Sequence, residues 1–484
     1  MLNVPTPLLV TSVTLLISAV LCLLLEGAGV QEGFKKIGNK PHIALLTFLS
    51  IAGVALYSLS APVSFSNPIF AFDQAAKWAI FFSCLMALFC LILSMLQSRD
   101  LRQERGEKYA LLLVALLLVI VMCTLKDILY FTICVSLWTL IMMALAAFDN
   151  YHQLGSEVAA KIFIKASFLL LSMATAIAFS YLCSGSTQFA SIANAINDPL
   201  NATLGKIAWS FIWILVLSFF DVAPFFWFHI DYLDGTSSYL STAFAMGSFI
   251  PGSIILLRMI EANQIAGNAS PILLNFLGFF AMLSMLIPGF MAIDQRRIAR
   301  MAVYLFMLQP GLWLTLTLAN ANLSQATPFM FFMFLVNVAV AIPGVILGLN
   351  FLKIPAHLEM TWEDYAGAGR KHPFIITAWL ISLSSLVGVP GTLGFYIRMS
   401  ALKNLFLNQY FLSGIIMILS IIIGTAPVAR LAVFLFAKSP HYEFSSLHPT
   451  KHTVFLFSCA VVLIATGMLP QLLWQLIAIL PNHD

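Results

Sequence analysis

The sequence carries little charge for its length. Of its 484 residues, 9% are Asp, Glu, Lys or Arg and 61% are hydrophobic, whereas a soluble domain has about a quarter charged residues. Such a chain lacks the polar side chains to cover a surface that faces water, which excludes a soluble globular protein. Its mean hydropathy of +0.96 predicts an integral membrane protein whose surroundings are lipid.

Motifs for catalysis and cofactor binding are also missing. The seven cysteines are dispersed and form no CxxC pair, so we expect buried apolar thiols and no redox or metal site. The sequence has no glycine-rich phosphate loop, no cluster of metal ligands and no nucleophile elbow. We therefore expect no catalytic residue, cofactor or metal in this chain. The net charge of +4 gives no reason to expect a nucleic-acid partner.

Long apolar runs fill most of the chain, and fourteen reach the roughly 17–25 residues that a spanning helix needs. They lie near residues 7–27, 42–62, 75–97, 109–125, 127–148, 158–184, 204–227, 238–258, 272–293, 298–320, 328–353, 373–397, 411–437 and 452–480. The sequence thus predicts an all-α polytopic fold of about 14 transmembrane helices. The first run has no basic start and no cleavage-type site, so we expect a mature helix and not a signal peptide.

The distribution of Lys and Arg predicts the orientation, because basic loops stay on the cytoplasmic side. The odd-numbered connections contain Lys35, Lys36, Lys40, Arg99, Arg102, Arg105, Lys108, Arg296, Arg297, Arg300, Lys353, Arg370, Lys371, Lys438 and Lys451. The even-numbered connections contain Lys126, Lys206, Arg258, Arg398 and Lys403. Both termini are therefore expected in the periplasm or its equivalent.

Two predicted spans are interrupted by proline near their centres. LSFFDVAPFFWFHID (217–231) contains Pro224, and SLVGVPGTLGFYIR (385–398) contains Pro390 among glycines. A bilayer tolerates broken helices only where protein or a water-filled cavity covers the freed backbone groups, and transporters place ion sites there. The breaks fall in the seventh and twelfth spans. Because these are an odd number of spans apart, the pattern predicts two inverted five-helix repeats, helices 4–8 and 9–13.

This repeat gives a division of the chain into four parts. We expect three N-terminal helices in 1–108, the first repeat in 109–258, the second repeat in 272–437, and a loop with the last helix in 438–484.

Ionisable residues inside spans are costly and mark candidate ion pathways. They are Lys77, Glu157, Lys161, Lys165, Asp221, Arg398 and Arg430. Glu157, Lys161 and Lys165 share one helix face, and indicate either a polar pathway or a helix end whose lysines extend to the surface. Asp221 stands three residues before Pro224, where it serves either as a proton carrier or as an acceptor for freed amides.

Several segments, in order, resemble the antiporter-like membrane subunits of respiratory complex I, and subunit N of NADH–quinone oxidoreductase most of all. SEVAAKIFIKASFLLL (156–171) is similar to the family's Glu-Ala-Ala-Leu-Lys-Tyr-Phe segment, and APFFWFHIDYLDG (223–235) to its Pro-Phe-His-Phe-Trp segment. LVGVPGTLGFYIR (386–398) and PVARLAVFLF (427–436) also match. Because the sequence ends after the fourteenth predicted span, at Asp484, we expect subunit N and not the distal subunit, which has a long lateral helix.

The resemblance also implies where proton carriers should stand, and this sequence departs from it there. The family's helix-five glutamate falls on Ser136, its helix-seven lysine on Phe219 and its helix-eight lysine on Phe249. A helix-ten histidine position falls on Gln309, and the helix-twelve lysine on Arg398. Phenylalanine cannot titrate, and arginine holds its proton too tightly to release it. We therefore expect dry packing around Ser136, Phe219 and Phe249.

Three functions stay open from the sequence. The first is an antiporter-like membrane-arm subunit of a complex I-type assembly in a bacterial inner membrane, with impaired or absent proton conduction, whose partners are the other membrane-arm subunits. The second is an active proton or cation channel rerouted through Asp221, Lys161, Lys165 and Glu157. The third is a membrane partner in another complex of the same fold, such as a cation antiporter or an inorganic-carbon uptake system.

Overall fold

The structure, a computed structural model, is a multi-pass helical membrane protein. It describes residues 5–31, 41–61, 65–97, 106–148, 155–198, 200–226, 229–232, 236–265, 267, 271–319, 327–351, 362, 365–437 and 449–471. Within these residues, twelve helical stretches are long and apolar enough to cross a membrane, and Pro373–Val387 and Thr453–Met468 are shorter apolar helices. The predicted all-α polytopic fold is confirmed, while the inverted repeats and the four-part division remain predictions.

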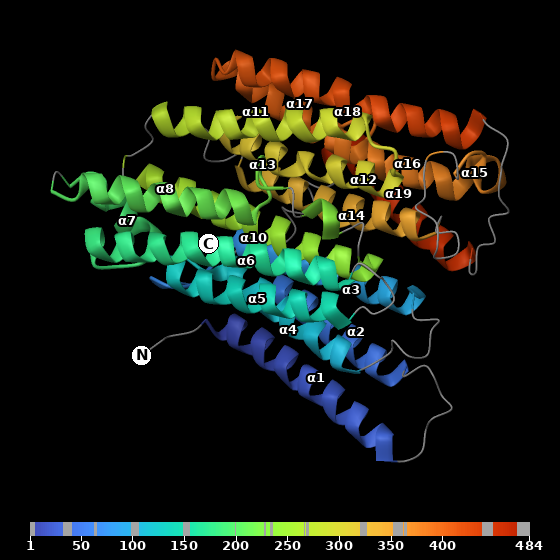
Figure 1. The fold of residues 1–484 in the computed structure, drawn as a ribbon, viewed down its shortest axis with the longest axis horizontal. Coiled ribbons are helices and arrows are strands. Elements are labelled where there is room, and N and C mark those ends of the chain that lie inside the picture. The colour runs from blue at the N-terminus through green and yellow to red at the C-terminus, as the bar shows by residue number, and fades with distance from the viewer. Residues whose placement is uncertain are drawn as a thin grey trace. The chain divides into compact units, whose positions relative to one another are not determined.

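The chain divides into two compact units (Figure 1). The first holds the described residues of Met1–Phe220 and Gly235–Ala269, and the second those of Asp221–Asp234 and Ser270–Leu480. The elements of the first unit are α1 (Thr6–Gln31), α2 (Pro41–Ser60), β1 (Phe65–Ser66), β2 (Ala71–Phe72), α3 (Gln74–Gln97), α4 (Gly106–Thr124), α5 (Ile128–Phe148), α6 (Gly155–Ser184), α7 (Phe189–Ala195), α8 (Ala202–Phe219) and α10 (Ser238–Ile265). The strands β1 and β2 pair antiparallel, with Phe65 opposite Phe72.

The second unit holds a helical turn at 229–232 and nine labelled helices. These are α11 (Pro271–Ile293), α12 (Ile298–Phe306), α13 (Leu308–Ala319), α14 (Thr327–Phe351), α15 (Ala368–Lys371), α16 (Pro373–Val387), α17 (Leu393–Leu407), α18 (Phe411–Ala437) and α19 (Pro449–Met468). Within each unit the long helices lie side by side (Figure 1).

Two almost wholly buried helices, α10 in the first unit and α14 in the second, carry small residues where a neighbouring helix approaches closely. In α10, Gly247 faces the ring of Trp138 from α5, and in α14, Gly348 faces the ring of Trp379 from α16. The Trp379 indole N–H also donates to the backbone oxygen of Val345 at 3.0 Å. Small residues let helices approach closely in a membrane, where packing replaces the hydrophobic effect as the force between them.

The helices end at the predicted breaks, but not where apolar runs alone suggest. The run near 204–227 was expected to form one span, yet α8 ends at Phe219 and Asp221 takes a left-handed conformation, with φ of 56°. The run near 373–397 divides into α16 and α17, because Gly388 and Gly391 both have φ of 90°. Hydropathy does not register such conformational breaks.

The structure describes only some of the basic residues on which the predicted orientation depends. Lys35, Lys36, Lys40, Arg99, Arg102, Arg105, Lys353 and Lys438 lie outside the described residues. Four of the five residues assigned to even-numbered connections lie in helices, because Lys206 belongs to α8, Arg258 to α10, and Arg398 and Lys403 to α17. Arg258 and Arg398 are also buried. Arg258 donates to the backbone oxygens of Leu125, Ala71 and Cys123. The orientation itself remains a prediction.

The close approach at Gly247 makes a stability prediction. An alanine Cβ there would lie 2.1 Å from the Trp138 ring, so Gly247→Ala should destabilise the protein by about 1–3 kcal/mol through overpacking. We expect a lower thermal unfolding midpoint in detergent. The control is Gly53→Ala in α2, where nothing lies within 4 Å of the added Cβ, and where alanine favours the helix. Equal midpoints for both variants would contradict this packing.

Candidate functional site: two helix breaks

The first family carrier position, Phe219, lies in an aromatic cluster at the end of α8. Its ring packs edge-on against Phe131 of α5, with centroids 5.5 Å apart, and against Trp138, at 6.2 Å. Trp138 in turn meets Phe244 of α10 at 6.0 Å. Phe219 is 2% exposed. The space around this position is therefore filled by ring surface.

The second position, Phe249 of α10, extends the same kind of packing. Its ring meets Phe220 edge-on at 6.1 Å, and both side chains are fully buried. Phe220 also lies against Gly252, where any Cβ would come within 2.5 Å of its ring. An apolar, close-packed surface of this kind offers no hydrogen bonds to a chain of water molecules.

Ser136 does not belong to the aromatic cluster. Its side chain is half-buried, and its hydroxyl donates at 2.8 Å to the backbone oxygen of Ile133 in its own helix. The α5 side chain that reaches Phe219 is Trp138. Phe219 and Phe249 thus lie in close ring packing and Ser136 lies outside it, because residues two positions apart point to different faces of a helix. The dry packing itself remains a prediction.

In the second unit, two substituted positions meet at one backbone oxygen. The Gln309 side chain, from α13, donates through Nε2 to the oxygen of Leu386 at 2.9 Å. Arg398, from α17, donates through Nη2 to the same oxygen at 2.8 Å. Leu386 belongs to the last turn of α16, beside the Pro390 break. A cation at this end of a helix is stabilised by the helix dipole.

The bonds continue from Gln309 through a polar chain that returns to α17. Asn337 of α14 donates to Gln309 Oε1 at 3.3 Å, and Ser385 Oγ donates to Asn337 Oδ1 at 2.7 Å. The Gly394 amide then donates to Ser385 Oγ at 3.3 Å. Gln309, Asn337 and Ser385 are fully buried. We call Gln309, Asn337, Ser385 and Arg398 the polar brace.

Arg398 is the charged member of the brace. It is 1% exposed, and its Nε and Nη1 atoms make no hydrogen bond with the described residues. Gly388 allows this position, since a Cβ there would come within 2.8 Å of Nη1. The missing side chain at Gly388 thus leaves the space that the Arg398 guanidinium occupies at the end of α16.

The Pro224 break holds a different arrangement, a buried acid beside an imidazole. Asp221 Oδ2 lies 3.0 Å from His229 Nδ1, and the two side chains are 0% and 1% exposed. The Ala223 amide, freed by the break, donates at 2.8 Å to Ser284 Oγ of α11. His229 was missed as a site residue in the sequence, because its partner stands eight residues away across an irregular turn.

Side chains on both sides of His229 contact α12. Asp231 lies 3.8 Å from Arg300, and both are about one-third exposed. Phe226 packs edge-on against Tyr304 at 6.3 Å, and the Tyr232 ring lies 5.7 Å from that of His229. The segment 221–232 is therefore anchored to α11 and α12 within the second unit.

Glu157, Lys161 and Lys165 of α6 show different degrees of burial. Glu157 and Lys161 form an ion pair at 2.7 Å, with 56% and 32% of their side chains exposed. Such an exposed pair is typical of a helix end and contributes little stability. Lys165, one turn further, is buried.

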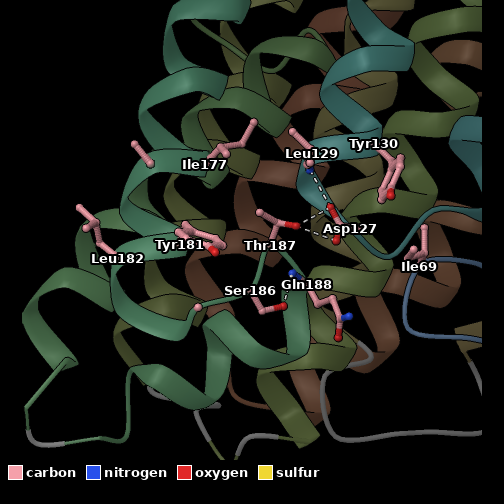
Figure 2. A pocket seen from close by; sticks show the side chains of 12 residues that line it. Ile69, Asp127, Leu129, Tyr130, Ile177, Tyr181, Leu182, Ser186, Thr187 and Gln188 are labelled. Carbon is pink, nitrogen blue, oxygen red and sulfur yellow. Dashed lines mark hydrogen bonds between the residues drawn. The ribbon is translucent and has the colours of Figure 1, made fainter.

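A pocket of about 660 Å³ in the first unit is lined by residues that stabilise the local structure (Figure 2). Among them, Asp127 accepts hydrogen bonds from the Leu129 amide at 2.8 Å and from the Thr187 hydroxyl at 2.9 and 2.7 Å. Asp127 thereby caps α5 and ties the connection after α4 to the one after α6. Within the part of the chain that is described, no group of His, Cys, Asp and Glu suited to a metal ion is found.

Comparison with known proteins shows the family to which this chain belongs. Residues 125–424, more than half of the chain, match the family model described as NADH:quinone oxidoreductase/Mrp antiporter, TM. The chain is 25% identical over 456 residues to NADH-quinone oxidoreductase subunit N of Anoxybacillus flavithermus, covering 91% of this chain and 90% of that protein.

Solved structures show the same fold. A chain of respiratory complex I from Thermus thermophilus aligns with a TM-score of 0.78 and 20% identity, over 96% of this chain and 98% of its own. A chain of the Mrp complex from Dietzia sp. DQ12-45-1b aligns with a TM-score of 0.79 and 14% identity, over 96% of both chains. The protein belongs to the NADH:quinone oxidoreductase/Mrp antiporter family of membrane subunits.

Proposed function

We propose that this chain is an antiporter-like membrane-arm subunit of a complex I-type NADH–quinone oxidoreductase, in the place of subunit N, with little or no proton conduction through its own channel. Its similarity to subunit N extends over about nine-tenths of both chains. Its partners would be the other membrane-arm subunits and lipid. Its location would be the bacterial inner membrane, with both termini in the periplasm.

The observation that carries the loss of conduction is the state of the substituted carrier positions. Phe219 and Phe249 are buried in ring packing, and Gln309 and Arg398 are bound to one backbone oxygen. A proton carrier has to change its protonation state. Phenylalanine and the glutamine amide have none to change, and arginine stays protonated.

The rerouted channel is the weaker alternative. It relies on Asp221, Lys161, Lys165 and Glu157, yet Lys161 is partly exposed and paired with Glu157, as expected of a lysine that extends toward the membrane surface. Of the two lysines, only Lys165 is buried.

A place in another complex is supported by one observation. The fold is as similar to the Mrp complex chain, with a TM-score of 0.79, as to the complex I chain, with 0.78. Similarity at this level of identity concerns the fold alone, so the assembly has to be tested directly.

Purification from native membranes in mild detergent tests the assembly. We expect the other membrane-arm subunits of a quinone reductase to co-purify with this chain, identified by mass spectrometry. Copurification with cation-antiporter subunits or with an inorganic-carbon uptake protein would replace the proposed assembly by that one.

Proton pumping by the assembled enzyme tests the rerouted channel. Lys165→Gln should leave the protons pumped per quinone reduced unchanged, because on our proposal no proton passes through α6. Lys206→Gln, in an exposed part of α8, is the matched control. A lower ratio for Lys165→Gln, with normal assembly and an unchanged Lys206→Gln control, would favour the rerouted path.

The polar brace predicts coupled stability effects. Gln309→Leu removes a donor to Leu386 and leaves the Asn337 amide without its acceptor, at a cost of about 1–3 kcal/mol. Because Gln309 and Asn337 are bonded, Gln309→Leu and Asn337→Leu should be non-additive by about 0.5–3 kcal/mol. Thermal unfolding of the single and double variants in detergent measures this coupling. Additive effects would show that the two side chains act independently.

A further inference from the structure

Asp221 and His229 form a buried acid–imidazole pair at the Pro224 break. Their atoms Oδ2 and Nδ1 are 3.0 Å apart, and neither side chain is more than 1% exposed. Neither residue stands at a position where the family resemblance puts a carrier. The substitutions at the implied carrier positions therefore do not explain why this pair is present.

The backbone is arranged to make this contact. Asp221 follows directly on the end of α8 and has φ of 56°. Left-handed geometry is unfavourable for most residues, but Asp and Asn tolerate it. Strained geometry of this kind recurs at functional sites. Here it comes with an anchored turn, because the Ala223 amide is bound to Ser284 of α11.

The chemistry of the pair defines two charge states. An ionised carboxylate only accepts hydrogen bonds, so His229 then donates through Nδ1–H. In that state the pair carries a charge of −1. Adding one proton at Nε2 gives an imidazolium beside a carboxylate, with a net charge of zero. A buried pair gains from this change because an isolated charge is costly in a low dielectric.

We propose that His229 and Asp221 form a proton-binding site, in which His229 takes up and releases one proton at Nε2. Asp221 is the positioning residue, since its carboxylate fixes the tautomer and stabilises the imidazolium. One proton enters from water and one leaves to water, and no bond other than N–H is formed or broken. This inference goes beyond the proposed function, because the pair binds a proton in whichever complex contains the chain.

Other titratable groups lie around the pair. The Tyr232 ring is 5.7 Å from the imidazole. Asp231 and Arg300 form their own pair at 3.8 Å and are partly exposed, and Tyr304 packs on Phe226. The acid–imidazole pair is thus fully buried, whereas the neighbouring Asp231–Arg300 pair is partly exposed.

Nitrogen-15 NMR of the histidine-labelled full-length protein in detergent tests the site. The His229 signal is identified by its absence in His229→Gln. The spectra are recorded from about pH 8 to about pH 5, and we expect the His229 signal to show both the neutral Nδ1–H tautomer and the imidazolium within this series. A His229 signal that shows no protonation change in the wild-type protein over this range would overturn the proposal, whatever the variants do.

The role of Asp221 is tested by three variants. Asp221→Asn should remove the imidazolium signal at a pH where the wild-type protein shows it, because the amide carries no charge. Asp221→Glu should restore it in part. Asp231→Asn, an acid on the same segment with its own partner, should leave the His229 signal unchanged. An imidazolium signal that persists unchanged in folded Asp221→Asn would exclude the positioning role.

Discussion

A helix that breaks inside a bilayer has to bind its own freed backbone groups, because lipid offers no hydrogen bonds. Each break in this protein meets that constraint with side chains from neighbouring helices. At the first break, the Ser284 hydroxyl accepts a hydrogen bond from the Ala223 amide. At the second, Gln309 and Arg398 both donate to the oxygen of Leu386. Side chains at each break thus form the hydrogen bonds that the freed backbone groups need. A side chain held in such a bond is less available to carry protons.

The two breaks have consequently become different kinds of site. At the second, the polar brace uses a permanently charged residue and amides, whose bonds do not depend on protonation. At the first, Phe219 ends α8 in an aromatic cluster, while the residues that follow belong to the second unit and carry the Asp221–His229 pair. The positions at which the family resemblance implies lysines therefore have different surroundings at the two breaks.

Hydropathy predicted the fold well because span length and composition depend on the bilayer and not on partners. Among the described residues, twelve helical stretches are long and apolar enough to cross a membrane, and two further apolar helices are shorter. Details of the site were less predictable. The sequence predicts the same dry packing around Ser136 as around Phe219, whereas the α5 side chains that meet Phe219 are Phe131 and Trp138. The acceptor shared by Gln309 and Arg398 is a backbone oxygen, which no residue pattern reveals. His229 finds its partner only through the left-handed turn at Asp221.

Both breaks bury a charge, and the difference between them is whether that charge can change. Arg398 keeps its proton, and the carbonyl end of α16 offsets part of its field through the helix dipole. No such fixed compensation is needed by the Asp221–His229 pair, because a single proton makes it neutral. On our proposal, a change of proton concentration therefore changes the charge at the first break and not at the second.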